Sequence, residues 1–151
     1  EQENKNLGFV GKPKTILKEK IQSVINKNLI PILSPMGKDD EDLKYNINAD
    51  TAAAAVAKSL KSRRLLLMTD VEGVYDENKK LINEIKPGEA KNLIDKKIVQ
   101  GGMIPKLLNS IDAIENGVRG VVIIDGRKLH SILHEIFSDE GAGTLIRKWK
   151  N

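Results

Sequence analysis

A cluster of amide and carboxylate side chains directly precedes an alanine-rich run in the first third of the chain. Asn46, Asn48 and Asp50 occupy alternate positions just before Ala52–Ala57. Side chains at alternate positions of an extended segment share one face, so the two amides are expected to point to the same side. The alanines favour a helix, and Asp50 or Thr51 is expected to cap its first N–H groups. Such a cluster serves either helix capping or the binding of a polar ligand.

Two glycines and a lysine lie at the expected start of a later helix. Gly101 and Gly102 allow the backbone to approach a ligand closely, and a helix N-terminus favours an anion. Lys106 would fall in the first turn, where a cation is poorly matched to the helix dipole unless an anion lies there too. The stretch is therefore either a phosphate site or a glycine turn with a solvent lysine. It lacks the Gly-Lys-Ser/Thr ending of a P-loop.

A third candidate is the loop that follows the apolar run Leu65–Leu67. Met68–Asp76 contains a threonine, three acidic residues, a glycine and a tyrosine. A loop at the end of a buried strand is a natural place for the base and ribose of a nucleotide. The alternative is an ordinary strand exit that Asp70 caps.

Aliphatic runs and helical patterns alternate along the chain. Short apolar runs predict strands at Leu29–Ser34, Leu65–Asp70, Gly120–Asp125 and Thr144–Arg147. Leu7–Gly11 is expected to be a strand or hairpin arm, and Leu81–Ile85 a short strand or a turn. Helical spacing predicts helices at Thr15–Asn28, Thr51–Ser62, Pro87–Lys97, Ile104–Asn116 and Leu129–Phe137. This order predicts an α/β fold with a mainly parallel sheet sandwiched by helices in three layers. Ligands bind at the carboxyl ends of such strands, where Asp70 and the Gly101-Gly102 turn are expected to meet.

Composition narrows the class of protein further. The chain of 151 residues is long enough for a core, which must be aliphatic because aromatic residues make up only 3%. It has no cysteine, which excludes disulfides and fits a reducing compartment, so we expect a cytoplasmic location. No basic stripe carries interleaved aromatics and no apolar run reaches membrane-spanning length, so neither a nucleic-acid partner nor a membrane is expected. His130 and His134 lack a third ligand nearby, so no protein-held metal is expected.

Taken together, the stretches resemble the acetylglutamate kinases of the amino acid kinase superfamily. The motifs that carry the resemblance, in order, are Tyr45–Ala53, Leu67–Val74 and Gly101–Lys106, with Leu7–Gly11, Ile123–Arg127 and Phe137–Thr144 extending it over nearly the whole chain. The resemblance implies an amino acid kinase fold. It also implies phosphorylation of the side-chain carboxylate of N-acetyl-L-glutamate with MgATP, in arginine biosynthesis.

Residue roles follow from position within the motifs. Asn46 and Asn48 resemble the residues that bind the substrate. Asp50 resembles the aspartate that organises the catalytic lysines. Lys106 resembles the lysine that stabilises the transferring phosphoryl group. A carboxylate is already a nucleophile, so the reaction needs positioning and charge neutralisation rather than a base, with Mg²⁺ held mainly by the nucleotide phosphates. The residues that resemble ATP-binding segments are Thr69, Asp70, Val71, Glu72, Gly73, Val74, Tyr75, Ile98, Val99, Gln100, Gly101, Gly102 and Met103.

The resemblance also predicts regulation. Glu135 and Gly141 fit the arginine inhibitor site of arginine-sensitive members, whereas Val122 stands where those enzymes often have histidine. The full-length protein is expected to be a homo-oligomer.

The main departure from the family concerns length, because acetylglutamate kinases are about twice as long as a domain of this size. Residues 1–151 are therefore expected to be the C-terminal, nucleotide-binding part, with the N-terminal substrate-binding half absent. The chain would then be a natural short form, a fragment or an incomplete gene model. Alternatives are a non-catalytic ATP-binding module, or a carbamate, glutamate or aspartate kinase.

Overall fold

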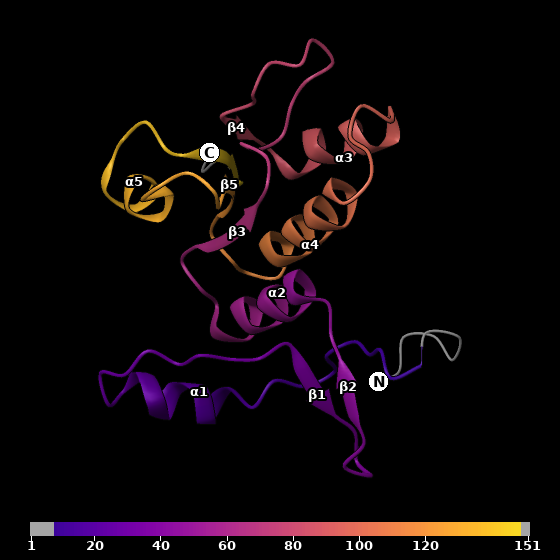
Figure 1. Cartoon of the computed structure of the whole chain (residues 1–151), viewed down its shortest axis with the longest axis vertical. Helices are drawn as coiled ribbons and strands as arrows, with labels where there is room; N and C mark the ends of the chain where they lie inside the picture. The colour runs from indigo at the N-terminus through magenta and orange to yellow at the C-terminus, as the bar shows by residue number, and fades with distance from the viewer. Residues whose placement is uncertain (1–7, 149–151) are drawn as a thin grey trace. The chain divides into compact units, whose positions relative to one another are not determined.

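The computed structural model describes residues 8–148. The chain divides into two compact units, Glu1–Leu60 and Lys61–Asn151 (Figure 1). No helix among the described residues combines the length and apolar character needed to cross a membrane. Leu7, where the first strand was expected to begin, lies outside the described residues.

The first unit contains a helix, a hairpin and a second helix. Its elements are α1 (Lys18–Ile25), β1 (Met36–Lys38), β2 (Lys44–Asn46) and α2 (Ala49–Leu60). The two strands are antiparallel, with Gly37 opposite Tyr45. The carboxylate of Asp39 accepts the N–H groups of Glu41 and Leu43 at 2.9 and 3.0 Å, which closes the turn. The expected first strand is reduced to one parallel bridge, between Val10 and Asn46.

Helix α2 begins directly after Asn48, which caps it. The Asn48 backbone carbonyl accepts the N–H of Ala52 at 2.9 Å, and its side-chain oxygen accepts the N–H of Thr51 at 3.1 Å. The prediction that Asp50 or Thr51 is the cap was therefore wrong. Asparagine is as strong an N-cap as aspartate, and Ala49 extends the helix by a residue that favours it.

The predicted buried strand at Leu29–Ser34 was also wrong. No strand forms there, and the side chains of Ile30 and Ile32 are 89% and 93% exposed. Apolar, β-branched residues favour a strand only when a neighbouring strand pairs with their N–H and C=O groups. No segment in residues 8–148 does so at this position.

The second unit is an α/β arrangement, which confirms the predicted fold class. Its elements are β3 (Leu65–Thr69), β4 (Glu84–Ile85), α3 (Pro87–Asp95), α4 (Met103–Glu115), β5 (Val121–Asp125), α5 (Ser131–Phe137) and β6 (Gly143–Ile146). The sheet has the order β3-β5-β6-β4, with β3–β5 and β4–β6 parallel and β5–β6 antiparallel. In Figure 1 the sheet lies between α5 on one side and α3 and α4 on the other.

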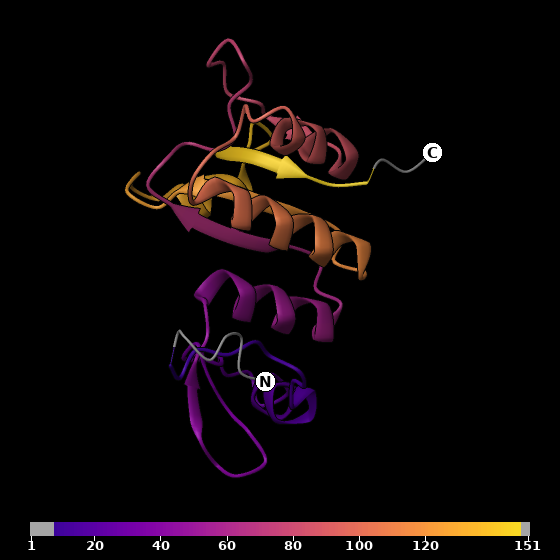
Figure 2. The ribbon, with the colours of Figure 1, turned by 90° about the vertical axis from the view of Figure 1, so that its right-hand side faces the viewer.

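Strand β5 is the centre of the core. All five of its residues are buried, and Val121 to Ile124 expose none of their surface. Figure 2 shows α4, in orange, running along one face of the sheet. A strand covered on both faces reads as a continuous aliphatic run, which is why its position could be predicted from the sequence.

The carboxyl ends of β3 and β5 lie at the same edge of the sheet. Thr69 is in register with Asp125, and the Thr69 carbonyl accepts the N–H of Gly126 at 2.8 Å. The loop that begins at Asp70 therefore starts at this edge, as predicted.

Candidate functional site

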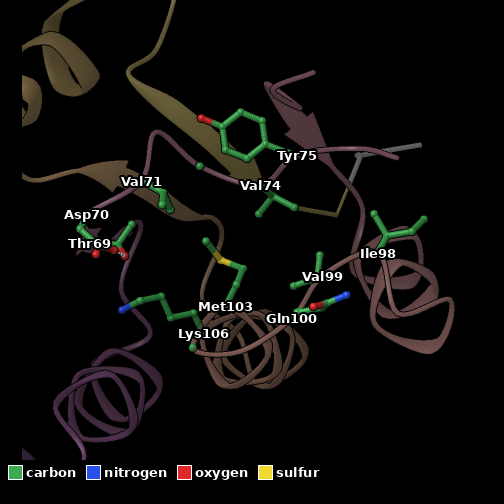
Figure 3. Close-up of a pocket in the computed structure, with 12 residues that line it drawn as sticks. Thr69, Asp70, Val71, Val74, Tyr75, Ile98, Val99, Gln100, Met103 and Lys106 are labelled. Carbon is green, nitrogen blue, oxygen red and sulfur yellow. Dashed lines mark hydrogen bonds between the residues drawn. The ribbon is translucent and has the colours of Figure 1, made fainter. Parts of the chain in front are cut away.

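A cavity of about 390 Å³ opens in the second unit, between the loop after β3 and the segment leading into α4 (Figure 3). This volume falls within the usual range of small-molecule sites, about 300–1,000 Å³. The residues that line it are Thr69, Asp70, Val71, Gly73, Val74, Tyr75, Ile98, Val99, Gln100, Gly102, Met103 and Lys106. Every one was predicted from the sequence to bind ATP or to act in catalysis. Two further predicted ATP-binding residues, Glu72 and Gly101, do not line the cavity.

The loop after β3 is anchored to the sheet by a buried threonine. The Thr144 hydroxyl accepts the N–H of Val74 at 2.8 Å and donates to the Ile82 carbonyl at 2.6 Å. A Cβ at Gly73 would lie 2.4 Å from that hydroxyl oxygen, so glycine is required for the close approach. These contacts hold one wall of the cavity against the core.

Glu72 supports the same loop from outside the cavity. Its carboxylate pairs with the Lys128 ammonium and accepts the Tyr75 hydroxyl at 3.2 Å. The hydrogen bond from Lys128 lowers the pKa of Glu72, and the bond from Tyr75 lowers it further. Burial and the contact with Glu72 raise the pKa of Tyr75. Glu72 therefore stays ionised and holds the side chain of Tyr75, which does line the cavity.

The opposite wall is the start of α4. Gly101 has φ +58°, a left-handed conformation that favours glycine, and Gly102 is the N-cap residue without a side-chain cap. No acidic residue lies in the first turn of the helix. In Figure 3 the half-buried side chain of Lys106 extends toward Thr69 and Asp70. Backbone N–H groups and an ammonium group together suit an anion such as phosphate.

Most of the remaining lining of the cavity is apolar, with Gln100 the polar exception on the wall that leads into α4. Its aliphatic and thioether walls are contributed by Val71, Val74, Ile98, Val99 and Met103, with the ring of Tyr75 beside them. An apolar cleft with an ammonium group at one end can hold a ligand that combines a flat heterocycle with an anion.

A second carboxylate is fixed at the same edge of the sheet. Asp125 is buried, and its oxygens accept the Arg127 backbone N–H and guanidinium at 2.9 to 3.0 Å. The guanidinium hydrogen bonds lower the pKa of Asp125 from its usual 3.8 to about 2. This carboxylate organises the turn after β5 rather than the cavity.

The predicted substrate and aspartate residues lie in the first unit. Asn46 and Asn48 are exposed and Asp50 is half-buried. The Asn46 backbone is held by the Phe9 carbonyl and the Gly11 N–H, at 2.8 and 2.9 Å. The side-chain oxygen of Asn48 is engaged in capping α2. Their roles therefore stay predictions.

The two predicted effector residues lie together in the second unit. Glu135 is buried, pairs with the Arg64 guanidinium and accepts the N–H of Ala142 at 2.9 Å. Gly141, at φ +70°, would place a Cβ 3.4 Å from the Glu135 carboxylate.

Sequence reasoning missed three supporting residues: Arg64, Lys128 and Thr144. Their partners lie 71, 56 and 70 residues away in the chain. Local spacing carries no signal for such pairs. Within residues 8–148, no group of three or more His, Cys, Asp or Glu side chains is placed to hold a metal ion.

Sequence comparisons give the chain known relatives. A model of the amino acid kinase family matches residues 1–125. The acetylglutamate kinase of Pelagibacter ubique is 54% identical over 147 residues, which cover 97% of this chain and 51% of that protein. The acetylglutamate kinase of Nitrobacter hamburgensis is 49% identical over 143 residues, which cover 95% of this chain and 48% of that protein. The chain thus spans about half the length of the curated relatives it matches.

Solved structures share the fold. The smu.665 protein of Streptococcus mutans matches 97% of this chain and 55% of its own, with 33% identity and a TM-score of 0.82. A carbamate kinase from Giardia lamblia, bound to AMP-PNP, has 23% identity and a TM-score of 0.74. The match covers 93% of this chain and 47% of the carbamate kinase chain. The family model covers well over half of the 151 residues, and the fold agrees with it. This chain therefore belongs to the amino acid kinase family.

Proposed function

We propose that this chain is the nucleotide-binding part of an ATP-dependent acetylglutamate kinase, with the substrate-binding half corresponding to the part of the relatives that it does not span. The observation that carries the proposal is the cavity between Thr69–Tyr75 and Ile98–Lys106. It occurs in a chain 54% identical to a named acetylglutamate kinase over 97% of its length. That similarity favours N-acetyl-L-glutamate over carbamate, glutamate or aspartate as the acceptor. It also favours an enzyme over a non-catalytic ATP-binding module.

The proposed reaction moves one phosphoryl group. A carboxylate oxygen of N-acetyl-L-glutamate bonds to the γ-phosphorus of ATP, while the bond to the β–γ bridging oxygen breaks and ADP leaves. No proton has to be removed from the nucleophile, so positioning and charge neutralisation supply the catalysis. This step belongs to arginine biosynthesis.

Each residue then has a role in that step. The apolar walls and Tyr75 bind the base, and the residues of the β3 loop and the start of α4 hold the ribose and phosphates. Lys106 neutralises charge on the transferring phosphoryl group, and Asp50 positions the catalytic lysines. Asn46 and Asn48 bind the acyl substrate. Mg²⁺ enters as MgATP, held mainly by phosphate oxygens.

Calorimetric titration of the purified chain with MgATP tests the nucleotide site. Lys106→Met is expected to weaken binding, because an ammonium group facing the phosphates is lost. Lys91→Met, a change at an exposed lysine of α3, is the matched control and should bind as the unchanged chain does. Equal affinity for the Lys106 variant would refute its phosphate contact.

Turnover is tested in a full-length enzyme that carries this sequence as its C-terminal part. Lys106→Ala should lower kcat about 10²- to 10³-fold, the usual loss when one group that stabilises transition-state charge is removed. KM for either substrate should change much less. Acyl phosphate formed from N-acetyl-L-glutamate can be trapped with hydroxylamine, and an unchanged kcat would rule out the proposed role.

We further propose that Glu135 and Gly141 contribute to an arginine effector site. The Glu135 carboxylate already binds one guanidinium group, that of Arg64, so its position is chemically suited to arginine. Free arginine must share or displace that contact. Arginine titration of the full-length enzyme tests the site, and activity that does not respond to arginine would refute it.

The remaining proposals concern the whole protein. We place it in the cytoplasm, which fits a chain without cysteine, and expect the full-length protein to be a homo-oligomer. Light scattering of that protein would decide the oligomeric state.

A further inference from the structure

The cavity in the second unit has two chemically different ends. The polar side chains among the residues that line it are Thr69, Asp70, Tyr75, Gln100 and Lys106. In Figure 3 the ammonium group of Lys106 lies on the same side as Thr69 and Asp70, and the amide of Gln100 lies on the opposite side. Because the ammonium end suits phosphates, the Gln100 end is left for the base of a nucleotide.

The other groups near this end cannot tell one purine from another. The side chains of Ile98 and Val99 are aliphatic and pack against the flat face of any base. The ring of Tyr75 can stack on every base, because each base has a π-face. Its hydroxyl donates to Glu72 at 3.2 Å, a carboxylate outside the lining of the cavity. Discrimination between purines therefore falls to the amide of Gln100.

The backbone just before Gln100 is fixed to the end of α3. The Leu93 carbonyl accepts the N–H groups of Ile98 and Val99 at 3.0 and 3.3 Å. Between α3 and these residues, Lys97 has φ +57°, the left-handed conformation that often ends a helix. The carbonyl of Lys97 is thus held in place by hydrogen bonds on both sides of it.

This carbonyl orients the amide of Gln100. Gln100 Nε2 donates to the Lys97 carbonyl oxygen at 3.3 Å. A carbonyl oxygen can only accept, so the nitrogen of the amide must face it and the oxygen must face away. Within residues 8–148, no group donates a hydrogen bond to Gln100 Oε1. Gln100 is exposed, so this acceptor is accessible to a ligand that enters the cavity.

We infer that Gln100 Oε1 accepts a hydrogen bond from the 6-amino group of adenine and makes the cavity select adenine over guanine nucleotides. The inference rests on the proposed nucleotide site. At this position adenine presents an N–H donor, whereas guanine presents an oxygen acceptor. Two acceptors that face each other both stay unpaired, which costs binding free energy. Hydrogen-bonding groups of this kind discriminate between ligands that an apolar pocket accepts alike.

Calorimetric titration with matched nucleotides tests the inference. MgATP is compared with the magnesium complex of purine riboside 5′-triphosphate, in which hydrogen replaces the 6-amino group. The unchanged chain should bind MgATP about 3- to 10-fold more tightly, the usual contribution of one hydrogen bond. Gln100→Met keeps the length of the side chain and removes its polar atoms, so this variant should bind the two nucleotides equally. A purely structural role of Gln100 would leave the ratio of affinities unchanged.

A second variant should reverse the preference. Gln100→Arg replaces the acceptor with donors alone, so the variant should bind inosine 5′-triphosphate, which carries an oxygen at position 6, more tightly than ATP. Gln22→Met, at a glutamine of α1 in the first unit, is the matched control and should keep the preference of the unchanged chain. Ratios of kcat/KM in the full-length enzyme supply a second readout of the same selectivity.

Two results would overturn this inference alone. One is equal affinity of the unchanged chain for ATP and the analogue without the amino group. The other is a preference for ATP that survives both substitutions of Gln100. Failure of the chain and of the full-length enzyme to bind any of these nucleotides would instead refute the proposed nucleotide site, and this inference with it.

Discussion

At the scale of single residues, Glu72 joins two parts of the chain that lie 56 residues apart. It lies in the loop that lines the cavity, yet its carboxylate faces Lys128 and the Tyr75 hydroxyl. The motif predicts a nucleotide contact, and the structure indicates a support for Tyr75. A residue inside a binding motif can thus act on the ligand through its neighbour.

Lys128→Met should weaken MgATP binding about two- to fivefold, because a solvent-screened ion pair makes only a modest contribution to the placement of the loop. Lys128→Arg should restore binding, since it keeps the charge beside Glu72. Lys80→Met, at an exposed position in the same loop region, serves as the control in calorimetry. Loss of binding in the arginine variant as well would contradict a role based on charge.

Asp125 makes stability depend on pH. Its pKa is about 2 in the folded chain and near 3.9 in an unfolded chain, so its contribution is complete above about pH 4 and is lost as the pH falls toward 2. The unfolding free energy of Asp125→Asn should therefore fall less than that of the unchanged chain as the pH is lowered from about 4 to 2. Urea unfolding of both proteins at about pH 5 and pH 2.5 measures how much unfolding free energy each loses. Equal losses in the two proteins would argue against Asp125 as the source of this pH dependence.

At the scale of secondary structure, the antiparallel contact between β5 and β6 depends on a glycine. A Cβ at Gly143 would lie 2.1 Å from the Ile123 carbonyl oxygen and 2.9 Å from that of Glu72. Both neighbours are backbone atoms, which cannot turn aside as a side chain can. The same strand carries Thr144, which anchors the wall of the cavity, so this close approach also fixes the site.

Gly143→Ala should destabilise the second unit by about 3 kcal/mol or more, in the range of severe steric substitutions. Gly88→Ala is the matched control, because nothing lies within 4 Å of the added Cβ in the first turn of α3. Thermal unfolding followed by circular dichroism compares the two variants. Similar melting temperatures would show that the strands can separate to accept the methyl group.

At the scale of the whole molecule, the two units differ in how much apolar surface they bury. The second unit has the wholly buried β5 and the fully buried Leu107 and Ile146 beside it. The buried apolar residues of the first, within its described part, are two isoleucines and two alanines. Because burial of apolar surface is the main stabilising contribution, the two units should differ in stability.

Amide hydrogen exchange of the isolated chain is expected to show this difference. Backbone amides of β5 should exchange most slowly, near the rate set by global unfolding, and those of α1 and β1 should exchange much faster through local opening. Uniform protection across both units would instead mean that they unfold together.

The sequence alone determined the elements whose signals are local. The continuous aliphatic run of β5, the proline at the start of α3 and the glycine pair before α4 each mark their element, and together they place the carboxyl edge of the sheet. The resemblance to acetylglutamate kinases, rather than these local signals, added Ile98–Gln100 to the residues expected at the cavity. The Asn48 cap was equally local, and ranking asparagine with aspartate would have found it.

Only the tertiary structure decided which distant residues meet. Thr144 with Val74, Lys128 with Glu72 and Arg64 with Glu135 are contacts between segments far apart in the chain, and periodicity reports nothing about such partners. The same reason explains Leu29–Leu33. Its residues carry the propensity for a strand, but a strand exists only where another segment accepts and donates its hydrogen bonds.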